Sequence, residues 1–386
     1  MLKAIRDKLG LRSGDNDQPL DPITRMLVLT LAIAAIVAII GFWFYNRVHM
    51  FDSWRILTSV SKSDTEGTNY VLLGDRIIKY SHDGLFCVNL KNETLWSAAY
   101  SMQTPISEVC GGDMVIAEQQ GTQVYVLDRK GVIGTFSTTL PILRAHVASN
   151  GVVLLLLKDD DVTWVCLYDS SGNELAAVKT TIDDTGYPLA AAMTGNAKRV
   201  LVSYVEIEGS ELSTRLILYD FSSTSDEEHE VASLTYENEI FPEVFFADAK
   251  TPAAVGDQGC VVLTDEGKEK TRITFEEEIV STVHDEGTIA FIFHSDATDA
   301  RYELQAYNYK GRQILNLEFD FEYTDIKMND DEIIFYDTSE VNIYRTSGKQ
   351  KLSTRYDKEI TSFDPLSGFH KYLVVTEDSI DQIRIE

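Results

Sequence analysis

The chain has 386 residues, of which 44% are hydrophobic and 25% are charged, so it can bury a sizeable core and is not a disordered protein. It carries 34 Lys and Arg against 61 Asp and Glu, a formal net charge of −27. A chain this acidic repels phosphate backbones. The composition therefore argues against nucleic acid as a partner, while cationic ligands and basic proteins remain open.

Residues 1–25 are a short polar tail, and the 21 residues that follow, 26–46, contain no charge. At 1.5 Å per residue a helix of that length covers about 30 Å, the thickness of the hydrocarbon core of a bilayer. We therefore expect residues 26–46 to form a transmembrane helix. The alternative is a cleaved secretory signal, but the run is long for one and ends in the aromatic residues 42–45, which suit a membrane interface.

The flanking charges predict which side of the membrane each part occupies. Five Lys and Arg precede the apolar run, whereas only Arg47 and Arg55 follow it closely. Because positive residues are retained on the cytoplasmic side, the N-terminus is expected in the cytoplasm. Residues 47–54 would then be a juxtamembrane linker, and residues 55–386 an extracellular domain that stands off the anionic membrane surface because it is strongly acidic.

Beyond residue 46 the sequence consists of short apolar runs rich in Val, Ile, Tyr and Phe, separated by Gly, Asp, Asn and Ser, which is typical of β-strands. One unit recurs at residues 124–131, 164–172, 304–311 and 341–348: an apolar strand, a polar turn that ends in Gly, and a second strand. Glycine accepts the left-handed conformation that a tight hairpin requires.

Less regular copies of the unit occur at residues 86–96, 216–220 and 261–267. Together the copies give seven turns, near residues 92, 131, 172, 223, 267, 311 and 348. A repeat of about 40–50 residues with several short strands predicts a β-propeller of four-stranded blades.

The C-terminal region supplies only three strands after the last turn, at residues 360–363, 372–376 and 380–385. A propeller with an incomplete blade would expose a sheet edge at the join. We therefore expect residues 55–60 to provide the fourth strand, so that both ends of the chain share the last blade. The count is eight blades, with seven as the alternative if two irregular units merge. A closing strand beside the bilayer would fix how the ring lies over the membrane.

The blade pattern, especially residues 90–96, resembles the PQQ-like or quinoprotein-type repeat, a WD40-like propeller class. The order of features along the chain resembles a family of unknown function, made of single-pass membrane proteins from clostridia and other Firmicutes. The residues that carry this likeness are 55–60, 78–84, 141–142, 151–153 and 202–204. The resemblance implies a fold and a topology, and it implies no reaction.

Enzymes that use pyrroloquinoline quinone hold it with a stacking Trp, a calcium ion and commonly a disulfide between adjacent cysteines. This chain has no Cys-Cys pair, and outside the apolar run it has only Trp54, Trp96 and Trp164. We therefore expect no quinone cofactor, and we interpret Trp96 as a residue that packs between blades.

Metal and catalytic motifs are also missing from the sequence. Four acidic runs, at residues 159–161, 226–228, 276–278 and 330–332, lack the alternating spacing of a calcium loop and suggest solvated loop tips. His284 and His294 would lie on neighbouring strands at best, without a zinc motif. Neither a nucleophile elbow nor a phosphate-binding glycine loop occurs. No catalytic, cofactor-binding or metal-binding residue is predicted.

The four cysteines, Cys87, Cys110, Cys166 and Cys260, lie in or beside apolar strands and are expected to be buried thiols. Only Cys87 and Cys110 are candidates for a disulfide. The predicted function is a non-catalytic scaffold or sensor that binds a protein or another envelope component, much as quinone-free propellers of this type act in envelope assembly. The alternative is an envelope hydrolase with carboxylates or histidines gathered in the central channel.

Overall fold

The computed structural model describes residues 22–62, 67–209, 211–222 and 229–386. The chain divides into two compact units, residues 1–50 and residues 51–386. Most of the predicted tail and the acidic run 226–228 lie outside the described residues.

In the first unit, helix α2 (Pro22–Val48) covers the segment 26–46. Its apolar side chains are exposed, as at Ile33, Ile36 and Ile40, which are more than half accessible. No helix within the described residues is long and apolar enough to cross a membrane. The helical conformation of residues 26–46 is thus confirmed, and their role as a membrane span is not.

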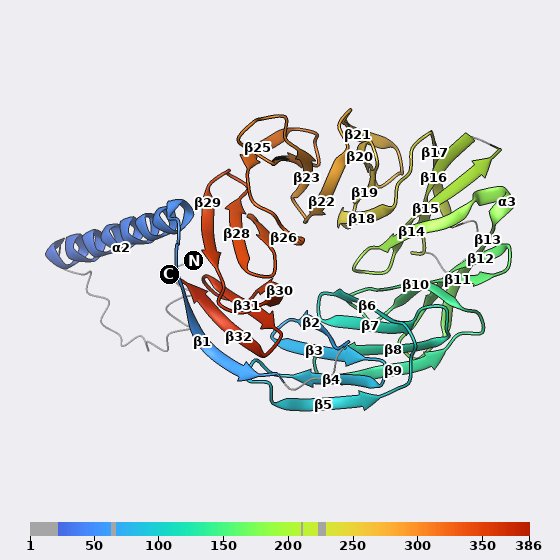
Figure 1. The fold of residues 1–386 in the computed structure, drawn as a ribbon, viewed down its shortest axis with the longest axis horizontal. Helices are drawn as coiled ribbons and strands as arrows, with labels where there is room; N and C mark the ends of the chain where they lie inside the picture. Colours follow the sequence, from blue (N-terminus) through green and yellow to red (C-terminus); the bar gives the residue numbers. More distant parts are fainter. Residues whose placement is uncertain (1–21, 63–66, 210, 223–228) are drawn as a thin grey trace. The chain divides into compact units, whose positions relative to one another are not determined.

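The second unit is all-β and contains eight antiparallel sheets of four strands each, arranged one after another around a ring (Figure 1). We number these sheets as blades 1–8. The first four blades follow the chain order. They are blade 1, β2 (Asn69–Leu73), β3 (Arg76–Ser81), β4 (Gly84–Val88) and β5 (Thr94–Ala99); blade 2, β6 (Pro105–Cys110), β7 (Asp113–Glu118), β8 (Gln123–Asp128) and β9 (Gly131–Ser137); blade 3, β10 (Ile142–Val147), β11 (Val153–Asp159), β12 (Val162–Tyr168) and β13 (Glu174–Thr181); and blade 4, β14 (Tyr187–Met193), β15 (Arg199–Glu208), β16 (Glu211–Asp220) and β17 (Glu230–Glu237).

The next three blades repeat this order, and blade 8 joins the two ends of the chain. They are blade 5, β18 (Glu243–Asp248), β19 (Thr251–Gly256), β20 (Gly259–Leu263) and β21 (Glu269–Thr274); blade 6, β22 (Ile279–His284), β23 (Thr288–His294), β24 (Tyr302–Asn308) and β25 (Gln313–Phe319); blade 7, β26 (Asp325–Asn329), β27 (Glu332–Tyr336), β28 (Glu340–Arg345) and β29 (Gln350–Arg355); and blade 8, β30 (Ile360–Pro365), β31 (Lys371–Thr376), β32 (Ser379–Ile385) and β1 (Trp54–Ser61). A four-residue helix, α3 (Ile182–Thr185), connects blades 3 and 4.

Blade 8 confirms that the two ends of the chain share one sheet. β1 pairs antiparallel with β32, from Trp54 opposite Ile385 to Ser61 opposite Ser379. The predicted strand over residues 55–60 is therefore the outer strand of the last blade, and the ring has eight blades, not seven.

The turn between the third and fourth strands explains the repeat seen in the sequence. An Asp or Asn side chain opens most of these turns and accepts hydrogen bonds from backbone N–H groups further on, as Asp169 does from Ser171 and Asn173. Gly172 then adopts a φ of +83°, which a residue without Cβ adopts without strain. Blade 1 places Asn92 at a φ of +61° instead, so its copy of the unit lacks the glycine.

Eight apolar clusters hold the ring, one between each pair of adjacent blades. The largest, between blades 7 and 8, contains thirteen buried residues, including Phe51. The smallest, between blades 8 and 1, contains five: Ile77, Val88, Leu373, Val375 and Ile380. Trp96 packs against the cluster between blades 1 and 2, as predicted.

Candidate functional site

The topology gives the propeller two faces. Because the strands of a blade alternate in direction, the first–second and third–fourth turns lie on one face, and the second–third turns and the connections between blades lie on the other. The chain enters the ring on the first of these faces, where the backbone N–H of Glu386 donates to the Ser53 carbonyl (3.0 Å). We call this the entry face, and we call the opposite one the acidic face.

The acidic face carries nineteen Asp and Glu residues in its described turns and connections, and all but Glu239 and Asp337 are exposed. The carboxylates are Asp83, Asp160, Asp161, Asp183, Asp184, Glu239, Asp257, Glu276, Glu277, Glu278, Asp296, Asp299, Asp320, Glu322, Asp337, Asp357, Glu359, Glu377 and Asp378. The described turns and connections hold only three Lys or Arg there. Of these, Arg301 pairs with Glu322, and Lys358 points to the buried Asp381.

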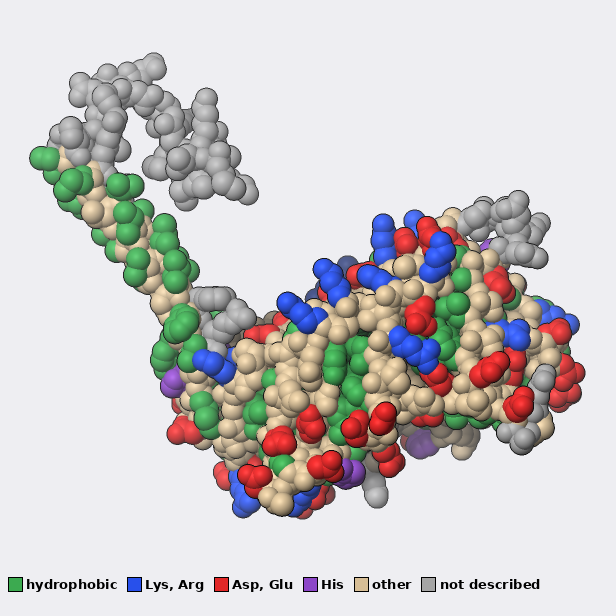
Figure 2. Space-filling view, turned by 90° about the horizontal axis from the view of Figure 1, so that it is seen from above, with side chains coloured by type: hydrophobic (Ala, Val, Ile, Leu, Met, Phe, Trp, Pro, Cys, Tyr) green, Lys and Arg blue, Asp and Glu red, His purple; other side chains and the backbone are tan. Residues whose placement is uncertain are grey.

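The entry face is different, because its described turns carry nine Lys and Arg and nine Asp and Glu, so the charges balance. The cations are Lys91, Arg129, Lys130, Lys198, Lys250, Lys268, Lys310, Arg312 and Lys349. Figure 2 shows the contrast along one side of the propeller: most Lys and Arg gather at one rim, whereas Asp and Glu predominate at the other. Among the described turns and connections, the net negative charge is thus concentrated on the acidic face.

The acidic runs of the sequence separate between the two faces. Residues 159–161 and 276–278 lie at the acidic face, and residues 330–332 lie at the entry face. Within the described residues, no group of three or more His, Cys, Asp and Glu is arranged to hold a metal ion. The face presents a distributed negative field and not a chelating site.

The first strand of each blade lies nearest the centre of the ring (Figure 1). At three of the blade interfaces, a pair of charged or polar side chains joins the first strands of the two blades. Glu108 accepts from His146 between blades 2 and 3 (2.5 Å), and Glu243 contacts His284 between blades 5 and 6 (3.0 Å). Lys327 and Asp364 pair between blades 7 and 8 (2.6 Å). The hydrogen bond to His284 lowers the pKa of the half-buried Glu243 carboxyl, although partial desolvation acts to raise it. These pairs tie adjacent blades together around the channel.

The two His–Glu pairs do not converge, because they lie on blade interfaces that are three blades apart. The His284 ring also stacks on the ring of Phe245, on the first strand of blade 5, at a centroid distance of 3.6 Å, which fixes its orientation. His294 is on the neighbouring strand β23, as predicted, but stacks on Tyr302 instead. A shared His site in the channel is therefore not formed by these residues.

A cavity of about 490 Å³ opens on the entry face between residues 329–332 of blade 7 and residues 365–372 of blade 8. Lys351, whose side chain is only 4% exposed, lies in it, pairs with Glu332 and donates to the Tyr372 hydroxyl (2.9 Å). Tyr372 in turn donates to Glu332 (2.6 Å). Burial lowers the pKa of Lys351 and raises that of Tyr372. The three groups satisfy one another and join blades 7 and 8; the sequence contained no signal for them.

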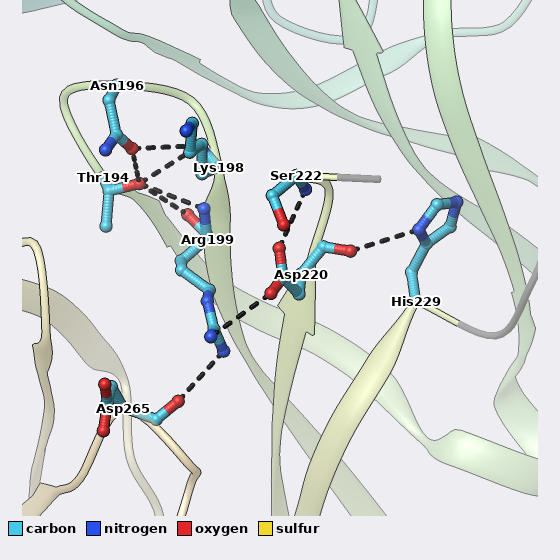
Figure 3. A network of polar contacts seen from close by, with 8 residues as sticks. All are labelled: Thr194, Asn196, Lys198, Arg199, Asp220, Ser222, His229 and Asp265. Atoms are coloured by element: carbon cyan, nitrogen blue, oxygen red, sulfur yellow. Dashed lines mark hydrogen bonds and ion pairs between the residues drawn. The ribbon is translucent and has the colours of Figure 1, made fainter. Parts of the chain in front are cut away.

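A second polar network joins blades 4 and 5 at the entry face (Figure 3). The Arg199 guanidinium pairs with Asp220 (3.2 Å) and donates to the backbone carbonyl of Asp265 (2.9 Å) in the next blade. Burial acts to raise the pKa of Asp220, but hydrogen bonds from Ser222 and the charge of Arg199 lower it overall. His229 contacts the Asp220 carbonyl oxygen (3.2 Å). The network fixes the turns of blades 4 and 5 against each other. Each residue shown in Figure 3 is used in a structural contact, so the network does not suggest a catalytic group.

All four cysteines are free, including Cys87 and Cys110. Burial raises the pKa of Cys166 and of Cys260 to about 12, so neither thiol ionises readily. A thiolate is the nucleophilic form of cysteine. Cys87, Cys166 and Cys260 are buried, as predicted, and act as small apolar residues in the core, whereas Cys110 is only half-buried.

Comparison with known proteins decides the family. The family of unknown function DUF5711 matches residues 46–385. The chain belongs to this family. No curated protein matches it. The predicted membership of a family of unknown function with a propeller domain is thus confirmed, whereas the bacterial group and the single membrane span are not.

Solved structures resemble this DUF5711 member in fold alone. BamB from Moraxella catarrhalis superimposes with a TM-score of 0.53 at 12% identity, covering 86% of this chain and 100% of that one. A eukaryotic initiation factor gives a TM-score of 0.55 at 9% identity, covering 86% and 87%. The likeness to BamB supports the predicted β-propeller fold. Identities this low carry no information about a ligand.

Proposed function

We propose that this DUF5711 protein is a membrane-anchored, extracytoplasmic scaffold without catalytic activity, and that it binds a basic protein at its acidic face. The observation that carries the proposal is the segregation of charge: nineteen carboxylates and three cations on one set of described turns, against nine of each on the other. The β-propeller fold supports it, because a ring of blades presents many loops on one rigid surface.

The electrostatic argument favours a protein partner over a small ligand. Carboxylates spread over the turns and connections of most blades repel one another, which costs stability, so their concentration on one face calls for a compensating role. Such a field attracts a basic surface and increases its association rate. It also repels anionic lipid and polymer surfaces, so we expect the acidic face to point away from the membrane.

The proposed membrane anchor is supported by the sequence. Residues 26–46 form an uncharged run of bilayer length, and the apolar side chains of α2 are exposed. The five Lys and Arg that precede the run favour a cytoplasmic N-terminus, with the propeller outside the cell.

The test is capture of partners by the full-length protein solubilised from its own membranes. The variant E276Q/E277Q/E278Q removes three charges from the acidic face. The matched control D330N/D331N/E286Q removes three exposed charges from the entry face. We expect a stoichiometric basic protein that binds at least tenfold more weakly to the first variant than to the control, with an affinity that falls as salt is added. Equal binding by both variants, or a partner that is not basic, would contradict the proposal.

The alternative function, an envelope hydrolase with its active site in the channel, is supported only by the two His–Glu pairs on the inner strands. Their separation by three blades favours a structural role for each. A hydrolytic activity that is abolished by His284→Gln while the unfolding midpoint is unchanged would favour the enzyme instead.

A further inference from the structure

The loop between β30 and β31, residues 366–370, exposes an aromatic side chain on the entry face. Phe369 is 72% exposed, and Gly368 beside it has a φ of +111°, a conformation that suits glycine. An isolated exposed Phe is ordinary on a protein surface, so its position decides whether it matters.

Phe369 lies next to the point where the chain enters the propeller. The ring of the following residue, His370, contacts the ring of Phe51 at a centroid distance of 4.7 Å. Phe51 is itself fixed to blade 7, since its N–H donates to the Lys351 carbonyl (2.8 Å). The exposed ring therefore belongs to the part of the entry face that is tied to the first residue of the propeller.

The chain length limits how far this part of the propeller stands from the bilayer. Five Cα–Cα steps separate Asn46, the last residue of the uncharged run, from Phe51. Fully extended, these steps reach at most about 18 Å. If residues 26–46 span the membrane, residues 366–370 lie within reach of the lipid headgroups, and the acidic face lies on the opposite side of the ring.

We propose that the 366–370 loop docks the propeller on the bilayer, with the Phe369 ring inserted at the lipid headgroup level. This inference rests on the membrane anchor proposed above and adds a second, non-covalent contact to it. Aromatic rings prefer the membrane interface, and Lys371 directly follows the loop as the first residue of β31, where it can meet anionic headgroups. Docking would hold the acidic face toward the partner.

The test uses the full-length protein in liposomes of phosphatidylcholine and phosphatidylglycerol whose acyl chains carry bromine near the headgroup. Phe369→Trp places a quenchable fluorophore in the loop. Ile207→Trp is the matched control, because Ile207 is 71% exposed but lies beside the second–third turn of blade 4, at the acidic face. Each variant is compared with the unsubstituted protein, whose own tryptophans supply the background.

We expect brominated lipid to quench the additional emission of Phe369→Trp at least twofold more than that of Ile207→Trp. Equal quenching in protein that floats with the liposomes after an alkaline carbonate wash would overturn the docking and leave the anchor intact. Protein that fails to float would overturn the anchor, and the docking with it.

Discussion

Asp381 holds the closing strand of the propeller, and replacing it tests how the ring is held shut. Its side chain is fully buried on β32 and accepts from the Ser59 hydroxyl of β1 (2.5 Å). It also accepts hydrogen bonds from the Tyr356 hydroxyl and the Lys358 ammonium, each at 2.8 Å. Both residues lie in the connection between blades 7 and 8. One carboxylate therefore joins the first strand of the ring, the last strand and the connection between blades 7 and 8.

The variant Asp381→Asn keeps the shape and removes the charge. Hydrogen bonds to a charged group contribute about 1.5–3 kcal/mol each. The amide keeps one acceptor oxygen, and Lys358 is 37% exposed, so water replaces part of what it loses. We expect the free energy of unfolding to fall by about 2–4 kcal/mol, measured by urea titration of the full-length protein.

The control is Asp378→Asn, which removes an equal charge from the exposed turn just before β32 and is expected to cost less than about 0.5 kcal/mol. Burial acts to raise the pKa of Asp381, but hydrogen bonds from Lys358, Ser59 and Tyr356 lower it overall. Its contribution is therefore complete above the ordinary value of 3.8 and is lost as the pH falls through the lowered pKa. A deficit no larger than that of the control at neutral pH would refute the reasoning.

Two further predictions concern the whole ring. Deleting residues 1–61 removes β1 and exposes β32 as a sheet edge, so this protein should unfold at clearly lower urea than one lacking only residues 1–47; equal midpoints would contradict the shared blade. Burial raises the pKa of Tyr204 to about 12 and also raises those of Tyr309 and Tyr356. Above the ordinary value of 10.0 these phenols lose their protons more readily in the unfolded state than in the folded one. The free energy of unfolding should therefore decline between pH 10 and 12, and it should decline less steeply in Tyr204→Phe. Unfolding followed by circular dichroism measures both.

The blade count could be predicted because one type of turn has a constant chemistry. Six of the seven predicted turns fall at or within the connections between the third and fourth strands of their blades, and the seventh, near residue 223, lies outside the described residues. That connection is a tight hairpin whose Asx and Gly residues are readable in the sequence, as at Asp169 and Gly172. Blade 8 has no such hairpin, since its third strand ends the chain and its fourth, β1, begins the ring. It had to be inferred from the missing strand.

The distribution of charge could not be predicted in the same way. Which face a turn occupies depends on the direction of its strands, and an exposed Glu at residue 277 looks no different in the sequence from an exposed Asp at residue 330. The buried groups were also missed. Lys351 follows the polar turn at residues 346–349 and suggests a solvated side chain, whereas the fold buries it against Tyr372, more than twenty residues further along.

The shared blade also determines the order in which the ring can be completed. β1 is the first strand of the propeller in the chain, but its partner β32 ends one residue before the C-terminus. During synthesis β1 therefore has no strand partner in blade 8 until β32 has been made, and forming this pair closes a loop of more than three hundred residues. The join between blades 8 and 1 is also the interface with the fewest buried apolar residues. This interface also depends on β32, so it too forms late, and it is where the ring should first open.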